Sequence, residues 1–287
     1  MRPFGLGTAR LGAFWQGRSV ADGREALAAA LDGGVNLLDT ADCYARGLAE
    51  RLVGREVRDR DACVMTKVGL VKTPVALASA ARHGPGGGRG RLSGLGPGGA
   101  ASTCFESAYI RAAAHRCLRR QRVERLDVLL LHEPDGDDLR AARFLTAVER
   151  LVADGDVAAW GASVRERDAA RAALTLPGLV VLELPCSVVD TSVVDTVRDA
   201  AAAAGVALVA IAALGDGRLL ERAAAARPGT PRSSLVAELG MAALRTPGVD
   251  AVVLGMSTPA HVRQVLAALP TAGGDDSLSA QLRAIAR

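Results

Sequence analysis

Aromatic side chains are scarce in this sequence. Phenylalanine, tryptophan and tyrosine make up 3% of the 287 residues, whereas hydrophobic residues as a whole make up 49%. The hydrophobic core must therefore be built mainly from alanine, valine and leucine. The scarcity also argues against a single-stranded nucleic acid as the ligand, because proteins that bind one stack its bases on aromatic side chains.

Cysteine is present but unclustered. The five residues, Cys43, Cys63, Cys104, Cys117 and Cys186, form no Cys-x-x-Cys pair. Their odd number and their scatter disfavour both a disulfide framework and a zinc site, and indicate reduced thiols in a cytoplasmic protein. We therefore expect no metal ligands among them.

Long hydrophobic runs are absent as well. The longest uncharged run covers residues 200–215 and contains Gly205, whereas a membrane span needs about 20 apolar residues. The amino terminus shows no apolar signal segment. We therefore expect a soluble, cytoplasmic protein without a membrane partner.

Neither sign of charge is in large excess, since the formal net charge is +4. The exception is a group of six arginines, Arg111, Arg116, Arg119, Arg120, Arg122 and Arg125. We interpret this group as a solvated helix face in preference to a nucleic-acid-binding patch, and we expect no nucleic-acid partner.

Short apolar runs alternate with helix-periodic segments along most of the chain. Strands are expected over residues 4–7, 35–38, 62–66, 126–131, 157–161, 179–184, 206–212 and 251–254. Helices are expected over residues 24–31, 47–58, 105–121, 138–153, 166–174, 192–204, 218–225, 233–244 and 259–268. Apolar strands that alternate with helices predict a parallel sheet with both faces covered. Eight such units favour a closed barrel, so we predict an α/β fold, a (β/α)8 TIM barrel, formed by residues 1–287 as a single domain.

A glycine-rich insert at about residues 71–104 breaks this alternation. Between Gly84 and Ala101 it shows no apolar periodicity, so we expect this part to contribute little to the core. A loop of this length is mobile or functional, and its place after the third barrel strand puts it over the mouth of the site. A partly disordered connection is favoured, and a substrate-dependent lid is the alternative. The insert lacks the P-loop pattern.

Four polar residues, Asp39, Tyr44, Lys67 and His132, follow apolar strands directly. Taken singly, each has an ordinary structural explanation as a helix cap, a wall residue, a solvated tip or a capped core histidine. The carboxyl ends of successive barrel strands meet at one rim, however, and the active sites of such barrels lie there. Together, the four residues indicate a catalytic site.

The chemistry of these residues suits proton donation to a carbonyl oxygen. The pKa of a phenol, about 10, is too high for ready proton exchange at neutral pH, and an adjacent ammonium lowers it. We therefore assign Tyr44 as the acid, Lys67 as the ammonium and Asp39 as the carboxylate that orients it. His132 hydrogen-bonds the substrate oxygen as negative charge develops there.

Several segments resemble signature sequences of the aldo/keto reductase superfamily. They are Gly5-Leu6-Gly7-Thr8, Leu38-Asp39-Thr40-Ala41-Asp42-Cys43-Tyr44, Met65-Thr66-Lys67, Leu130-Leu131-His132-Glu133-Pro134-Asp135 and Gly161-Ala162-Ser163. The similarity runs from about residue 5 to residue 268, and the insert, which ends in Cys104-Phe105-Glu106-Ser107, is similar to the branch of sugar and pyridoxal dehydrogenases. The resemblance implies a catalytic tetrad of Asp39, Tyr44, Lys67 and His132 with Tyr44 as the general acid/base.

The same resemblance implies an oxidoreductase that transfers hydride between NADP or NAD and a small carbonyl or alcohol substrate. Family members bind the cofactor directly on the barrel, so Gly5-x-Gly7 is interpreted as a strand-end turn. Arg10 stands where a dinucleotide-binding fingerprint has its third glycine. The cofactor contacts that the resemblance implies are Gly7, Thr8, Asp39, Ser163, Glu183, Leu214, Gly255, Met256, His261 and Gln264.

Several positions on the cofactor side depart from the family pattern. Val164 replaces an asparagine, Glu183 replaces a glutamine, and Ile211 replaces an aromatic residue that stacks on the nicotinamide. Gly255 and His261 stand where the resemblance leads us to expect a lysine and an arginine for the 2′-phosphate. Because a neutral imidazole cannot grip a phosphate as a guanidinium does, we expect a weak or reversed preference for NADPH over NADH.

These departures leave two alternatives to a nicotinamide-dependent reductase. One is an enzyme of the same fold that uses the tetrad for non-redox acid/base chemistry, such as elimination or isomerisation. The other is a non-catalytic binding subunit, which the intact tetrad disfavours because no binding role requires a buried lysine–tyrosine pair. The composition, rich in alanine, glycine and arginine, is associated with GC-rich bacterial genomes, where such enzymes often serve sugar or secondary metabolism.

Overall fold

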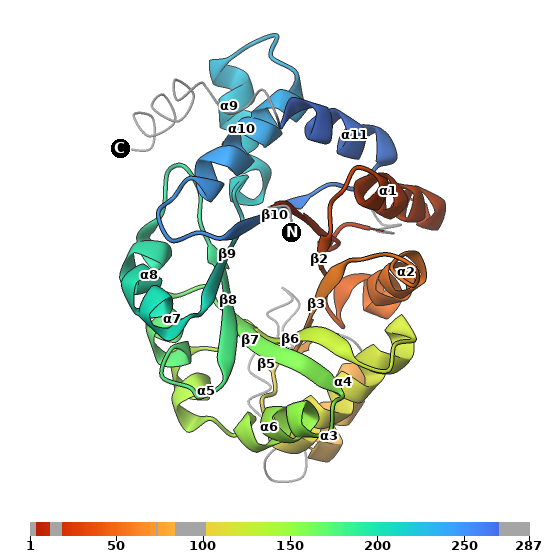
Figure 1. Ribbon diagram of the computed structural model, residues 1–287, viewed down its shortest axis with the longest axis vertical. Coiled ribbons are helices and arrows are strands. Elements are labelled where there is room, and N and C mark those ends of the chain that lie inside the picture. Colours follow the sequence, from red (N-terminus) through yellow and green to blue (C-terminus); the bar gives the residue numbers. More distant parts are fainter. Residues whose placement is uncertain (1–3, 12–18, 73, 84–101, 270–287) are drawn as a thin grey trace.

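Eight parallel strands form a closed barrel in the computed structural model of the chain (Figure 1). The structure describes residues 4–11, 19–72, 74–83 and 102–269, so the part of the insert from 84 to 101 lies outside the described residues. Around the barrel the strands follow the order β1-β10-β9-β8-β7-β6-β3-β2. Their bounds are Phe4–Gly7 (β1), Leu37–Asp39 (β2), Cys63–Val68 (β3), Leu126–His132 (β6), Val157–Ser163 (β7), Leu179–Pro185 (β8), Ala207–Ile211 (β9) and Ala251–Gly255 (β10). The predicted (β/α)8 barrel is confirmed.

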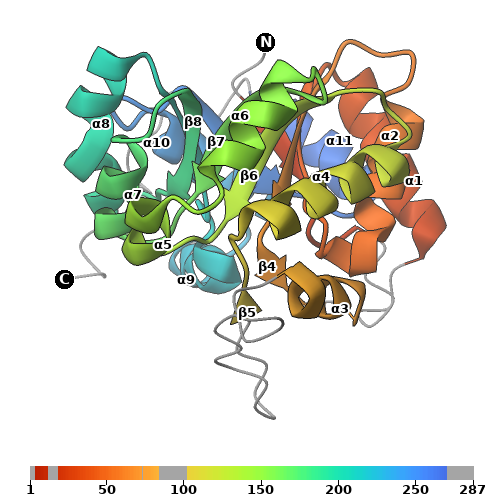
Figure 2. The same ribbon diagram turned by 90° about the horizontal axis from the view of Figure 1, so that it is seen from below.

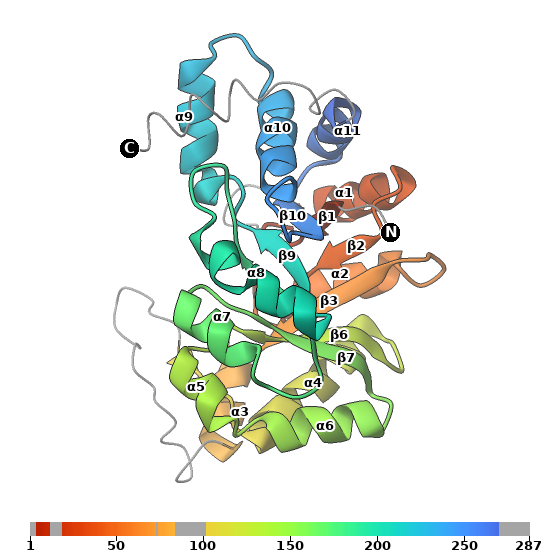
Figure 3. The ribbon, with the colours of Figure 1, turned by 60° about the vertical axis from the view of Figure 1, so that its left-hand side comes forward.

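Helices surround this barrel on its outer side (Figures 1 and 3). They are α1 (Val20–Asp32), α2 (Leu48–Glu56), α3 (Pro74–His83), α4 (Ser107–Gln121), α5 (Gly136–Ala141), α6 (Leu145–Ala153), α7 (Arg167–Ala173), α8 (Ser192–Ala204), α9 (Arg218–Ala226), α10 (Arg232–Leu244) and α11 (Pro259–Ala268), with short 3-10 helices η2 (Tyr44–Gly47) and η3 (Gly215–Gly217). The bounds predicted for α8 and α11 are those of the structure. Among the helices of the described residues, none is both long and apolar enough to cross a membrane.

All neighbouring barrel strands pair in parallel, so their carboxyl ends lie at one rim. At this rim, Gly7 of β1 pairs with Asp39 of β2 on one side and with Gly255 of β10 on the other. His132 of β6 pairs with Ser163 of β7. Residues that are more than 200 positions apart in the sequence therefore come together at the rim, as the register of Gly7 with Gly255 shows.

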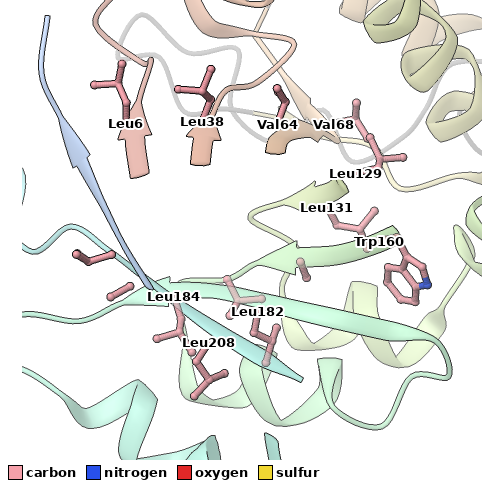
Figure 4. Packing of buried hydrophobic residues seen from close by; sticks show 14 of the residues in the cluster. Leu6, Leu38, Val64, Val68, Leu129, Leu131, Trp160, Leu182, Leu184 and Leu208 are labelled. Carbon is pink, nitrogen blue, oxygen red and sulfur yellow. The ribbon is translucent and has the colours of Figure 1, made fainter. Parts of the chain in front are cut away.

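Two layers of apolar side chains build the core, because successive side chains of a strand point to opposite faces of the sheet. The inner layer fills the barrel with Leu37, Met65, Leu130, Val181, Val209, Ala251 and Val253. The outer layer joins the strands to the helices, and Figure 4 shows Leu38, Leu182 and Leu208 within it. Alanine, valine and leucine supply most of both layers, as the scarcity of aromatic residues predicts.

The insert contains a helix that the sequence analysis does not predict. Helix α3 covers Pro74–His83, and two short strands, β4 (Leu70–Val71) and β5 (Ser102–Thr103), pair antiparallel outside the barrel. Proline at the first helical position and alanines behind it are ordinary helix signals. These signals stand directly before the glycine-rich stretch, and the sequence interpretation treats both as one irregular insert.

A second difference concerns the helix expected to begin at Asp138. The N-cap is Asp135, whose side chain accepts a hydrogen bond from the Asp138 backbone amide, and the Asp138 side chain accepts one from the Asp135 amide in return. Ala142 then takes the left-handed conformation (φ 48°), which splits the expected helix into α5 and α6. A capping box marks the start of a helix, so the sequence carries the start signal at Asp135, three residues before the expected position.

Candidate active site

A buried lysine lies between two carboxylates at the carboxyl-end rim. Lys67 of β3 donates a hydrogen bond to Asp39 Oδ1 of the neighbouring β2, and its Nζ lies 3.2 Å from Glu183 Oε2 of β8. Strand β8 stands on the opposite side of the barrel from β2, so Glu183 approaches the lysine from the far wall. None of the three side chains is more than 6% exposed.

The charges of these three groups depend on one another. Burial alone would lower the pKa of Lys67, but the negative charges of Asp39 and Glu183 outweigh it and raise that pKa, so the ammonium persists. Burial, together with the charge of Asp39, raises the pKa of Glu183 to about 8. One ammonium therefore balances one buried carboxylate, and Glu183 holds a proton at neutral pH.

Tyr44 and His132 stand beside this lysine. The Lys67 Nζ lies 5.5 Å from the centre of the Tyr44 ring. The rings of Tyr44 and His132 meet edge to face at 84°, with their centroids 5.8 Å apart. The structure thus brings together all four residues of the predicted tetrad, and it adds Glu183 to them as a second acid in contact with the lysine.

The protonation of the two rings follows from their burial. Burial raises the pKa of Tyr44, and the opposing effect of the Lys67 ammonium does not outweigh it, whereas the sequence predicts a lowered value. Burial and the positive charge of Lys67 lower the pKa of His132, which keeps the imidazole neutral. A protonated phenol and a neutral imidazole can each donate a hydrogen bond to an oxygen placed between them.

A strained turn carries Tyr44 from the end of β2 into α2. Ala45 (φ 46°), Arg46 (φ 56°) and Gly47 (φ 84°) follow one another in the left-handed region. For residues other than glycine this conformation costs roughly 1–2 kcal/mol. A Cβ atom at Gly47 would lie 2.7 Å from Arg120 Cδ, so a side chain there would also have to displace Arg120. Such strain persists only where the surrounding structure holds it, and it is concentrated at functional sites.

A cavity of about 1010 Å³ opens beside these residues. Seven of the predicted cofactor contacts line it, namely Gly7, Asp39, Glu183, Leu214, Gly255, His261 and Gln264, and Tyr44 and Ile211 line it as well. Thr8, Ser163 and Met256 are at most 4% exposed and are not among the lining residues. Met256 instead packs in the outer core layer, so its side chain faces away from the cavity.

The sequence of the chain matches the model of a known protein family. The model that describes the aldo/keto reductase family matches residues 3–239. The chain belongs to the aldo/keto reductase family. No curated protein shows a significant sequence match to this aldo/keto reductase.

Solved structures of other family members share the fold of this aldo/keto reductase. An aldo-keto reductase from Klebsiella pneumoniae in complex with NADPH is 24% identical, with 99% of this chain and 90% of that chain covered and a TM-score of 0.69. Glycerol dehydrogenase from Gluconobacter oxydans is 20% identical, with the same coverage and a TM-score of 0.69. An aldo-keto reductase from Bacillus halodurans in its holo form is 21% identical, with the same coverage and a TM-score of 0.70. At such identities the likeness shows the fold.

The sequence does not reveal which cations line the cavity of this aldo/keto reductase. Arg10, Arg165 and Arg232 line it. Arg165 Nε lies 2.9 Å from Glu133 Oε1, and Arg232 is paired with Glu221, whereas Arg10 forms no ion pair with a described residue. The three arginines lie far apart in the sequence, so no spacing pattern connects them. The available signal is that Arg10 and Arg165 each follow the end of a barrel strand closely, β1 and β7 respectively.

Proposed function

We propose that this aldo/keto reductase transfers hydride between a nicotinamide cofactor, NADPH or NADH, and a small carbonyl or alcohol substrate, with Tyr44 as the general acid/base. The observation that carries the proposal is the buried ammonium of Lys67. Its Nζ lies 5.5 Å from the centre of the Tyr44 ring, and two carboxyl groups hold it there. A buried ammonium beside a phenol stabilises the phenolate that remains after the phenol has given up its proton.

Each residue of the tetrad has a definite part in the reduction of a carbonyl group. His132, which is neutral, donates a hydrogen bond to the carbonyl oxygen and polarises it. Tyr44 transfers its hydroxyl proton to that oxygen, and the ammonium of Lys67 stabilises the resulting phenolate. In alcohol oxidation the phenolate takes the hydroxyl proton of the substrate. The nicotinamide, when bound, supplies or accepts the hydride at the substrate carbon.

The cavity fits a nicotinamide nucleotide in its size and in its polar groups. Its volume of about 1010 Å³ lies at the upper end of the range for ligand pockets, about 300–1,000 Å³. Glu183 Oε2 is buried and accepts no hydrogen bond from a described residue, although it lies 3.2 Å from Lys67 Nζ. A carboxamide N–H is a suitable donor to this oxygen. Arg10, which forms no ion pair with a described residue, supplies positive charge for a phosphate group.

Fluorescence titration with NADPH and with NADH tests the proposal. We expect both nucleotides to bind, with dissociation constants less than about tenfold apart, a factor equal to about 1.4 kcal/mol. The reason is that Gly255 and His261 offer no charge-assisted hydrogen bond to a 2′-phosphate, and that Arg232 is already paired with Glu221. A larger preference for NADPH that disappears in Arg232→Gln would contradict this expectation and assign the phosphate to Arg232. Failure of both nucleotides to bind at millimolar concentration would overturn the redox proposal.

One observation favours a second candidate, non-redox acid/base chemistry such as elimination or isomerisation. Glu183, with a pKa of about 8, can give and take a proton near neutral pH in the same cavity as Tyr44. A general acid or base is most effective when its pKa lies near the working pH. Turnover of a hydroxy-carbonyl substrate by nucleotide-free protein would support this candidate, and a strict requirement for a nucleotide would exclude it.

A further inference from the structure

A second concave region lies between helices α2 and α4, on the side of the barrel where α1 to α4 gather (Figure 2). We call it the arginine groove, and its volume is about 700 Å³. Seven arginines line it: Arg46, Arg51, Arg55, Arg116, Arg119, Arg120 and Arg122. Asp42 is the one acidic residue among its described lining residues, and the groove shares none of these with the cavity beside Tyr44.

Most of the positive charge of the groove has no counter-charge in the described part of the chain. Arg120 is paired with the buried Glu50. No ion pair to any described residue is formed by Arg46, Arg51, Arg55, Arg119 or Arg122. The sequence predicts a solvated helix face for this group of arginines, and four of its six members are exposed. The structure also sets Arg116, Arg119 and Arg120 of α4 opposite the arginines of α2. A concave surface that carries charge of one sign focuses its field and attracts counter-ions.

Two buried polar atoms at the groove have no hydrogen-bond partner among the described residues. Arg116 Nη1 donates to Ser79 Oγ at 3.0 Å, but Arg116 Nη2 has no acceptor. Asp42 is 6% exposed, and its Oδ1 has no donor. Buried polar groups are almost always hydrogen-bonded. An anionic oxygen in the groove would supply the missing acceptor of Arg116 Nη2, and it would accept a hydrogen bond from Asp42 when that carboxyl is protonated.

We propose that the arginine groove binds a small anion that carries two or more phosphate groups. The planar guanidinium matches the geometry of phosphate oxygens and pairs with them bidentately, and it stays charged at every physiological pH. Several arginines on facing helices around about 700 Å³ provide more space and more donors than one phosphate group uses. The concave shape and limited volume of the groove favour a small molecule over a nucleic-acid duplex, whose evenly spaced backbone charges need an extended basic surface.

The groove also offers an apolar wall to the organic part of such a ligand. Val20 of α1, Leu48 and Leu52 of α2 and Ala76 of α3 line it beside the arginines. Val20 is 45% exposed, so part of its side chain is open to a ligand. A nucleotide base or another flat group can cover this apolar surface while its phosphates reach the arginines.

Isothermal titration calorimetry with inorganic pyrophosphate at fixed ionic strength tests the proposal without any measurement of turnover. We expect the double variant Arg51→Gln/Arg55→Gln to bind pyrophosphate at least about tenfold more weakly than the unchanged protein. Both side chains are exposed on α2, so the fold is expected to persist, which a thermal melt checks. The matched control is Arg150→Gln/Arg171→Gln on α6 and α7, which removes the same charge from exposed positions and should leave the affinity unchanged.

Two further probes identify the kind of ligand. Tighter binding of ADP than of pyrophosphate, with the same loss in the double variant, supports the site and assigns it to a nucleotide. Equal affinities support the site and assign it to an inorganic anion. Absence of pyrophosphate binding at millimolar concentration, or an equal loss in the control variant, overturns the proposal. Tighter binding of a short DNA duplex than of pyrophosphate, abolished in the double variant, also overturns it in favour of a nucleic-acid surface.

Asp42 gives the site a pH-dependent signature. Burial and the charge of Glu50 raise the pKa of Asp42 to about 7, against the effect of the nearby arginines. The titratable and charged groups that act on it are Glu50 of α2, the adjacent Cys43, and Arg116, Arg120, Tyr109 and Cys117 of α4. A protonated Asp42 can donate a hydrogen bond to an anion, whereas the ionised form repels it. Sulfate, whose own charge is constant near neutral pH, should therefore bind more tightly below the pKa of Asp42 than above it.

The variant Asp42→Asn separates this effect from all other titrations. Asparagine keeps the size of the side chain and cannot ionise, so sulfate affinity in this variant should lose its change across neutral pH. The same pH dependence in both proteins would show that Asp42 does not contact the anion and would contradict the placement of the ligand at the buried end of the groove.

Discussion

Lys67 has one more acidic partner than its charge requires. Asp39 alone would neutralise the ammonium, and Glu183 adds a second carboxyl group from the opposite wall of the barrel. The glutamine that the family resemblance leads us to expect there carries no charge. The additional acid makes the net charge of the buried cluster change with pH near the pKa of Glu183, about 8. Replacement of Tyr44 and of Glu183 tests this cluster.

Replacement of Tyr44 by phenylalanine tests its role as the acid. We expect Tyr44→Phe to lower carbonyl turnover by about 10²–10⁴-fold, as is typical for loss of a general acid, with little change in nucleotide affinity. The matched control is Tyr109→Phe, because Tyr109 is fully buried and its hydroxyl has no hydrogen-bond partner among the described residues. Steady-state kinetics and nucleotide titration on both variants provide the measurement. Undiminished turnover in Tyr44→Phe would remove this residue from the mechanism.

Replacement of Glu183 by glutamine tests the second acid through the pH profile. Below a pH of about 8 the carboxyl of Glu183 is neutral, and above it the cluster gains a negative charge. This charge opposes the phenolate that forms on Tyr44, so kcat/KM for reduction should fall as the pH rises through about 8. In Glu183→Gln this decline should be absent or shifted upward. A decline at the same pH in both proteins would show that another group causes it.

The same variant has a readout that needs no substrate. The pKa of Glu183 is raised in the fold from 4.5 to about 8, so its contribution to stability is present below the unfolded value and is lost as the pH rises through the folded one. The free energy of unfolding of the unchanged protein should therefore fall between these two pH values more than that of Glu183→Gln. Denaturant titrations at several pH values measure the difference. Parallel curves would contradict the raised pKa.

At the scale of elements, the junction of β3, α2 and α4 holds the strand that carries Lys67 in place. Glu50 of α2 is fully buried and accepts hydrogen bonds from Thr66 Oγ1 (2.7 Å), Gln121 Nε2 (3.2 Å) and Arg120 Nε. Thr66 immediately precedes Lys67 on β3, so one carboxylate joins the strand of the lysine to two helices. The helices are also in close contact, because a Cβ at Gly54 would lie 2.0 Å from the carbonyl oxygen of Gln121.

Loss of the Glu50 charge should therefore be costly. Removal of one partner from a buried ion pair typically costs about 3–5 kcal/mol, and we expect Glu50→Gln to lie near the lower end because the Arg120 side chain is 16% exposed. The matched control is Asp195→Asn, whose partner Arg198 and own side chain are 38% and 47% exposed. An exposed pair of this kind contributes less than about 1 kcal/mol. Chemical denaturation of both variants gives the comparison, and equal effects would contradict the junction.

At the scale of the whole molecule, barrel closure brings the two ends of the described chain together. β1 pairs with β10 from Phe4↔Val252 to Gly7↔Gly255, so pairing of the last strand with the first closes the barrel. The two short strands of the insert lie outside this closed ring, and among the described residues β4 and β5 pair only with each other. The stability of the barrel should therefore depend little on the part of the insert between Gly84 and Ala101.

Replacement of residues 84–101 by a short Gly/Ser link tests this independence. Loop-closure entropy changes slowly with loop length, by about 0.6 kcal/mol per doubling, and 1 kcal/mol shifts the melting temperature of a large domain by only about 2–4 °C. We therefore expect a melting temperature within a few degrees of the original. A fall in activity without such a loss of stability would favour a lid, and collapse of folding would show that the stretch is part of the core.

The sequence alone determines the order of the eight barrel strands and shows which polar residues follow them. Apolar runs, helix periodicity and stop signals are local, as with Gly205, which ends α8 in the left-handed conformation (φ 67°). Asp39, Lys67 and His132 could be found because a parallel barrel places every strand end at the same rim, whatever the details of packing. The order of the strands is enough to place these three residues at one rim.

Only the tertiary structure decides how these residues are charged and what surrounds them. The contact of Glu183 with Lys67 crosses the barrel, and the arginine groove sets the arginines of α2 opposite those of α4. The pKa of Tyr44 is raised because its burial exceeds the effect of Lys67, a balance that depends on both depth and separation. Burial and Coulomb energy are functions of distance in space, and residues far apart in the chain acquire such distances only when the barrel closes.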